Sequence, residues 1–69
     1  MKKIVFVVDV NGGEYHSEIV MFGEFAKVGK MFEDEDGWMR YPVEVDGREI
    51  WFDEPVVAIY VGDELIYTR

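Results

Sequence analysis

The side chains that could act as nucleophiles or general bases are few in this chain, apart from its carboxylates. It has one histidine, His16, one serine, Ser17, and no cysteine. These two neighbours fall on a predicted strand, where successive side chains point to opposite faces, so they cannot form a nucleophile–base pair. His16 is expected to face Asp9 or Val7 across the first hairpin, depending on the register. No glycine-rich phosphate-binding loop is present. The sequence therefore predicts no catalytic residues and no cofactor.

The fifteen carboxylates could instead bind cations, and one run has a partial metal-binding pattern. Asp34-Glu35-Asp36-Gly37 resembles the part of a calcium loop in which alternating oxygen ligands precede a glycine. The full pattern also needs an acidic residue two positions earlier, where Phe32 stands, and a closing glutamate at the position of Val43. The pattern fails at both ends. We predict no dedicated metal site, and weak binding of Ca²⁺ or Mg²⁺ by this loop stays open beside a solvated turn.

The charge is large and unevenly distributed along the chain. The formal net charge is −8, from fifteen acids against seven bases. Residues 33–54 hold nine of the acids and two of the bases, so this stretch alone carries −7. Nucleic acids and anionic membranes are bound through Lys and Arg, and both would repel this chain. The acidic stretch therefore points to a basic protein partner, to cations, or to solubility alone.

Size and composition predict one small globular domain spanning residues 1–69. Hydrophobic residues make up 49% of the 69 and aromatic residues 16%, which favours a packed core over disorder. No segment approaches the run of about 20 apolar residues that a membrane-spanning helix needs. The run Met1–Val8 has the lysines of a signal peptide, but Asp9 interrupts it early, so a first strand is the better interpretation. A cysteine-free domain of this kind is expected in the cytoplasm.

The first elements are predicted from alternation and turn chemistry. Asn11-Gly12-Gly13 accepts positive φ and predicts a tight hairpin after the strand Ile4–Val10. The two-residue loop is either Asn11-Gly12 or Gly12-Gly13. Both choices place the same faces together, with Ile4, Phe6 and Val8 beside Tyr15, Ser17, Ile19 and Met21.

Residues 22–32 fit a short amphipathic helix better than a third strand. At 100° per residue one side of this helix is apolar and the other is charged or glycine. The apolar side holds Phe22, Phe25, Ala26, Gly29 and Phe32. Each glycine weakens the helix by about 1 kcal/mol relative to alanine. We predict the helix, with a strand as the alternative.

Asp46-Gly47 between two alternating runs predicts a type I′ hairpin. A two-residue loop here pairs Val45 with Arg48, Val43 with Ile50, and Tyr41 with Phe52. The opposite face then pairs Glu44 with Glu49, Pro42 with Trp51, and Arg40 with Asp53. Proline lacks a donor N–H, so Pro42 should lie on an edge strand or at a bulge.

A further hairpin, Val56–Val61 with Glu64–Thr68, turns at Gly62-Asp63 in the glycine-first arrangement of a type II′ turn. Alternation gives it one face of Val57, Ile59 and Ile66 and another of Ala58, Tyr60, Leu65 and Tyr67. Because both faces are apolar, it should be central, covered by the helix, or buried against another copy of the chain. The whole predicts a mainly β fold in the order ββαββββ, a curled antiparallel sheet or small open barrel similar in style to SH3-like and OB barrels.

The middle hairpin and the acidic run form the best candidate for a binding surface. Trp38 and Trp51 share its outward face with acids, and Glu44 opposite Glu49 is a like-charge pair that costs about 0.2–1 kcal/mol. A basic partner would relieve this repulsion. The predicted partner-binding residues are Trp38, Glu44, Glu49, Trp51 and Asp53, with Glu33, Asp34, Glu35 and Asp36 steering association.

The sequence thus predicts a non-enzymatic module that docks on a basic protein surface. If that surface normally binds nucleic acid, the module would be a competitive nucleic-acid mimic. In size and charge alone, the chain resembles the small acidic proteins that viruses and mobile elements use against host nucleases. The alternative is a self-associating structural subunit, such as a homodimer, or a designed β scaffold without a partner.

Overall fold

The computed structural model describes all 69 residues, which form eight strands and no helix. The strands are β1 (Lys2–Val10), β2 (Tyr15–Gly23), β3 (Ala26–Val28), β4 (Phe32–Glu33), β5 (Met39–Val45), β6 (Arg48–Phe52), β7 (Val56–Val61) and β8 (Glu64–Thr68). The prediction of a mainly β, antiparallel fold is confirmed. The structure accordingly holds no helix long and apolar enough to cross a membrane.

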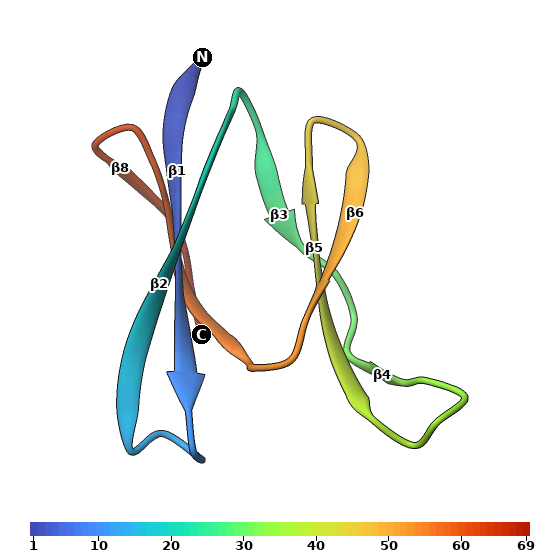
Figure 1. The fold of residues 1–69 in the computed structure, drawn as a ribbon. Coiled ribbons are helices and arrows are strands. Elements are labelled where there is room, and N and C mark those ends of the chain that lie inside the picture. Colours follow the sequence, from blue (N-terminus) through green and yellow to red (C-terminus); the bar gives the residue numbers. More distant parts are fainter.

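The strands form two antiparallel sheets, and the chain passes from one to the other between β2 and β3 and again between β6 and β7 (Figure 1). The first sheet has the order β2-β1-β7-β8. In the second sheet β5 is central, with β6 along one side and the short strands β3 and β4 along the other. The loop between β4 and β5 projects away from the first sheet (Figure 1).

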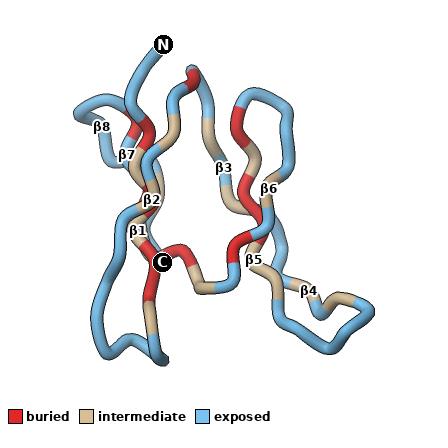
Figure 2. Tube along the Cα trace, in the orientation of Figure 1, coloured by how far each residue is buried: buried red, intermediate tan, exposed pale blue.

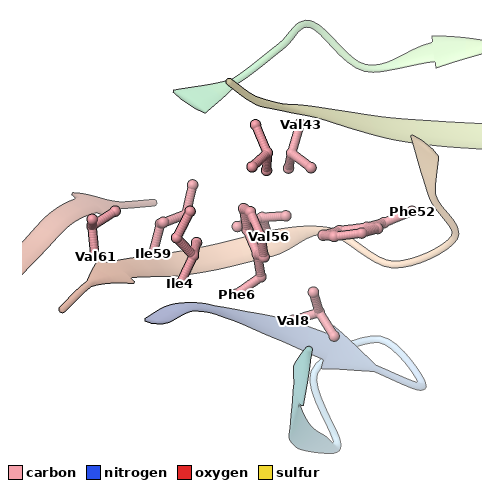
Figure 3. Close-up of a cluster of buried hydrophobic side chains, with 9 residues drawn as sticks. Ile4, Phe6, Val8, Val43, Phe52, Val56, Ile59 and Val61 are labelled. Atoms are coloured by element: carbon pink, nitrogen blue, oxygen red, sulfur yellow. The ribbon is translucent and has the colours of Figure 1, made fainter. Parts of the chain in front are cut away.

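One cluster of nine buried apolar side chains holds the two sheets together. Its members are Ile4, Phe6, Val8, Val43, Val45, Phe52, Val56, Ile59 and Val61. Side chains from β1 and β7 point toward those of β5 (Figure 3), and Phe6 meets Phe52 edge to face with ring centroids 5.2 Å apart. Buried residues concentrate along β1, β5 and β7, whereas the turns are exposed (Figure 2). Each fully buried side chain of this kind stabilises the fold by roughly 1.5–3 kcal/mol, so this thin core is the main source of stability.

The first hairpin has the predicted pairing of faces. Its ladder runs from Lys2 opposite Gly23 to Val10 opposite Tyr15. Of the two loops that the sequence left open, this register fits Gly12-Gly13. Residues 11–13 all have positive φ, between 52° and 92°, as their composition indicated.

The middle hairpin has the predicted register at all five ladder pairs, from Val45 opposite Arg48 to Tyr41 opposite Phe52. At the turn, φ is 51° for Asp46 and 84° for the following glycine, as a type I′ turn requires.

The predicted helix over residues 22–32 is wrong. This segment forms the end of β2, a turn, β3 and the start of β4. The turn is held by Asp46, whose carboxylate accepts the backbone N–H groups of Glu24 and Phe25 at 2.9–3.2 Å. These bonds, together with the ladder to β5, satisfy backbone groups that a helix would have satisfied locally. A helix containing Gly23 and Gly29 has low intrinsic stability, so these hydrogen bonds favour the strands over the helix.

Pro42 lies on a central strand, so the prediction of an edge strand is wrong, but its alternative of a bulge agrees with the structure. β3 ends at Val28 and β4 begins at Phe32, and the register against β5 shifts by one residue across this gap. Within the gap, Gly29 donates its N–H to the carbonyl oxygen of Pro42 at 2.9 Å. The nitrogen and oxygen of one strand residue point to the same side, so the missing N–H of proline falls in the interrupted part of the ladder.

The last hairpin turns at Gly62-Asp63 as predicted, with φ of 61° at the glycine. Two register shifts in the ladders of β7, one against β1 and one against β8, change which side chains share a face. Val57 and Ile66 are the extra residues at these shifts, and Tyr67 lies opposite Ile59. The strict alternation predicted for this hairpin is therefore wrong, because it assumed unbroken ladders. With no helix present, the predicted helical cover for its outer face is also wrong.

Candidate functional site

The acidic loop before β5 is built around Asp34. Its Oδ1 accepts the backbone N–H groups of Asp36 and Trp38, both at 2.9 Å, and its backbone N–H donates to the carbonyl of Trp38 at 2.8 Å. The N–H of Trp38, and then the guanidinium of Arg40, hold the pKa of the Asp34 carboxyl below its usual value. Asp34 therefore shapes the loop, and its carboxylate is already occupied.

Arg40 joins this loop to the end of β6. Its Nε donates to Asp34 Oδ2 at 2.7 Å, and its Nη1 contacts Asp53 Oδ1. The pKa of the guanidinium is raised, mainly by the hydrogen bond to Asp34, so Arg40 stays charged. The sequence placed Arg40 beside Asp53 across the hairpin, and the structure makes them an ion pair. The Asp53 side chain is still 77% exposed.

Glu44 and Glu49, the predicted like-charge pair, lie opposite each other but each has a partner within the chain. Lys27 on β3 lies opposite Glu44, with Nζ 3.8 Å from its Oε2. The indole Nε1 of Trp51 donates to Glu49 Oε1 at 2.8 Å. The sequence interpretation missed Lys27 because it placed this residue on a helix. The repulsion between the two glutamates therefore no longer argues by itself for an outside partner.

Trp51 lies on the outward face of the second sheet with Phe32. Their rings meet edge to face, with centroids 4.9 Å apart and planes at 79°. Pro42, the cross-strand partner of Trp51, is buried. A Cβ added at Gly29 would lie 3.1 Å from the Cγ of Pro42. Despite these contacts Trp51 is 52% exposed, and Trp38 on the loop is 66% exposed.

Two shallow hollows share Arg40 and divide the predicted residues between them. One is lined by Trp38, Met39, Arg40, Asp53 and Glu54. The other is lined by Phe32, Glu33, Asp34, Glu35, Asp36, Arg40 and Trp51. We call the region formed by both hollows the acidic–aromatic end. Glu44 and Glu49 line neither hollow. The sequence did not single out Phe32, Met39, Arg40 or Glu54 as binding residues, although Met39 and Glu54 each directly follow a residue that it did.

Each hollow of the acidic–aromatic end combines one exposed indole with carboxylates. Glu33, Glu35 and Asp36 are exposed, and no Lys, Arg or His nitrogen lies within 4 Å of their oxygens. An indole face beside a carboxylate suits a Lys or Arg side chain, which gains both a cation–π contact and an ion pair. Nowhere in the chain do three side chains of metal-ligating type converge.

A second polar cluster lies in the first sheet, next to the turn between β1 and β2. Asp9 is only 6% exposed and faces His16, whose Nε2 is 2.9 Å from Asp9 Oδ1, while Arg69 Nη2 lies against the other oxygen. The Asp9 register for His16 is thus the one adopted. Ser17 lies on the opposite face of β2, opposite Val8. This cluster ties the first hairpin to the end of the chain and holds no nucleophile beside the histidine.

No protein-family model, curated protein or solved structure matches this chain. The likeness to SH3-like and OB barrels therefore stays a prediction.

Proposed function

We propose that this protein is a non-enzymatic binding module whose acidic–aromatic end docks on a basic protein surface. The observation that carries the proposal is the pair of hollows around Arg40, each with an exposed indole and at least one carboxylate that has no ion-pair partner within the chain. Lys and Arg side chains of the partner would enter these hollows. Trp38 and Trp51 are the anchors, with Glu33, Glu35, Asp36 and Asp53 supplying charge.

The exposure of the two tryptophans supports this assignment. Trp38 makes no aromatic contact and stands on a loop that projects from the sheet, so its ring contributes little to the core (Figure 1). A cation–π contact at such a ring stabilises a complex by about 0.5–2 kcal/mol. Buried aromatic anchors within a charged rim are typical of protein interfaces.

The charge distribution supports the same partner. The stretch 33–54, which contains the whole acidic loop and both β5 and β6, carries −7 of the net −8. Such a field steers basic proteins toward this end and raises the association rate. Steering should weaken above physiological salt, where the Debye length falls below about 8 Å.

We further propose that the partner's surface is one that normally binds nucleic acid. The carboxylates would then occupy the positions of phosphates, and the module would compete with DNA or RNA as an inhibitor. Basic surfaces of this kind are abundant in the cytoplasm, where we place the protein.

The test is affinity capture of basic proteins from a lysate, with the intact chain as bait at low and high salt. Glu35→Lys/Asp36→Lys reverses two unpaired carboxylates and leaves the bonds of Asp34 in place. The matched control is Glu14→Lys/Asp63→Lys, which makes the same charge change in turns of the first sheet. This pair is preferred to reversal of Glu44 and Glu49, which would also break contacts within the chain.

The proposal predicts basic proteins that the wild type and the control retain, that Glu35→Lys/Asp36→Lys loses, and that both high salt and duplex DNA release. Equal retention by the two charge-reversal baits would contradict the assigned surface. Retention that DNA does not affect would contradict nucleic-acid mimicry while leaving the docking surface in place.

A further inference from the structure

The outer face of the first sheet is apolar and uncovered. The registers place Val20, Val5, Tyr60 and Leu65 side by side in one row across all four strands, from β2 to β8. Val20, Tyr60 and Leu65 are 46%, 38% and 47% exposed. Phe22, two residues along β2 on the same face, is 59% exposed.

The area of this face lies at the lower end of the largest patches that soluble monomers expose, which are often functional. Four strands about 4.8 Å apart, over five residues at about 3.3 Å each, cover roughly 300 Å² of flat surface per copy. Contiguous apolar patches beyond a few hundred Å² mark interaction sites on soluble proteins. Two such faces in contact cover roughly 600 Å² in total, below the size of stable specific interfaces, so only weak association is expected, with a dissociation constant of about 1–100 µM.

The charges around the row are complementary to those of a second copy. Lys3 lies on the same face two residues to one side of Val5, next to Phe22. Glu18 lies two residues to the other side, next to Val7. Neither Lys3 nor Glu18 has an ion-pair partner within the chain, and the rows that hold them are about 13 Å apart.

We infer that two copies of the chain pack through these outer faces, related by a two-fold axis that runs along the Val5 row. The axis brings the row of Lys3 and Phe22 in one copy over the row of Val7 and Glu18 in the other. Lys3 of each copy therefore lies beside Glu18 of the other. Two aligned sheets packed in this way form an ordinary β-sandwich interface.

The net charge of the chain also favours contact through this face. The residues outside 33–54 carry only −1 in total, and the acidic stretch belongs to the other sheet. The copies therefore meet at their least charged face, and both acidic–aromatic ends remain free.

Sedimentation equilibrium of the intact chain, from about 1 to about 500 µM, covers the expected range of dissociation constants. Val20 lies on the axis, so Val20→Asp places the carboxylates of the two copies opposite each other. This variant should weaken the dimer about 100-fold. Met31→Asp, between β3 and β4 of the second sheet, is the matched control at a side chain that is 51% exposed and should dimerise as the wild type does. Far-UV circular dichroism verifies that each variant is folded.

The decisive arm uses charge reversal at the two flanking rows. Lys3→Glu and Glu18→Lys should each weaken the homodimer, by about tenfold, because each places two like charges together. An equimolar mixture of the two variants should restore association, since the heterodimer again pairs opposite charges. General repulsion between acidic chains predicts something different, namely that Glu18→Lys tightens the dimer.

Three results would overturn the inference. The first is a wild type that stays monomeric up to the highest concentration. The second is a dimer that Val20→Asp leaves unchanged, as expected if the copies met through the second sheet. The third is a mixture of Lys3→Glu and Glu18→Lys that associates no better than either variant alone, as expected for pairing along the free edge of β2.

Discussion

The two exposed tryptophans should differ in what they contribute to folding. Trp38 is 66% exposed and has no aromatic neighbour, whereas Trp51 is 52% exposed and meets Phe32 edge to face. A tryptophan side chain can bury up to about 250 Å², so the 14-point difference in exposure corresponds to about 35 Å². At about 25 cal/mol/Å² this area is worth about 0.9 kcal/mol.

The aromatic contact adds to this difference. An edge-to-face pair is worth about 0.5–1.5 kcal/mol beyond its buried area. Trp51→Ala should therefore lower the free energy of unfolding by about 1.4–2.4 kcal/mol more than Trp38→Ala does. Differences between variants of this kind are more reliable than absolute sums of buried area.

Urea unfolding followed by far-UV circular dichroism measures this difference without depending on the tryptophan that is removed. At a slope of about 1 kcal/mol/M, typical of a small domain, the midpoint of Trp51→Ala should lie about 1.4–2.4 M below that of Trp38→Ala. Both variants should lose binding of basic protein, because each removes the indole of one hollow. Equal midpoints for the two variants would refute the assignment of Trp51 to a packed role and Trp38 to a free one.

Three further perturbations test the contacts that position the site. Gly23→Ala should destabilise the fold by about 1–3 kcal/mol in urea unfolding, because its Cβ would lie 2.7 Å from Asp46 Oδ2; an unchanged midpoint would contradict this close approach. The pKa values of Asp34 and Asp46 are held below 3.8, first by the backbone N–H groups that they accept, so their stabilisation is complete above about pH 4 and is lost as the pH falls through their folded pKa values. The urea midpoint of wild type minus that of Asp34→Asn/Asp46→Asn should accordingly shrink between pH 5 and pH 2, and a difference that grows would refute the sign. Lys27→Glu should destabilise the fold by less than about 1 kcal/mol, and Glu44→Lys in the same chain should restore the midpoint; failure of that rescue would mean that the pair makes no contact in solution.

The hairpin registers could be predicted because local turn chemistry sets them. Asp46-Gly47 and Gly12-Gly13 accept positive φ, and a two-residue loop then determines each pair along the ladder. The segment after β2 could not be predicted in this way. Its turn depends on the carboxylate of Asp46, which lies more than twenty residues further along the chain. The extra residues Val57 and Ile66 likewise leave no trace in the alternation of apolar side chains.

The candidate site could be predicted in part for the same reason. The register of the middle hairpin places Arg40 and Trp51 on one outward face and brings Asp53 to Arg40, and the structure adds that the two hollows share Arg40. The structural role of Asp34 was missed, although aspartate at the first position of a turn and glycine at the fourth is a known signal. Gly37 donates its N–H to the Asp34 carbonyl at 3.0 Å, as such a turn requires.

The most direct test of the central claim is a titration of the isotope-labelled chain with a short peptide of alternating arginine and lysine, followed by two-dimensional NMR. Both indole N–H signals report on the acidic–aromatic end, and the backbone signals of Glu18 and Glu64 report on the first sheet. The account predicts saturable shifts of the Trp38 and Trp51 indoles and of residues 33–36, with the first sheet unchanged and the shifts reduced by salt. Shifts spread evenly over all exposed carboxylates, with the indoles unaffected, would contradict a defined binding surface and reduce the acidic stretch to a solubilising one.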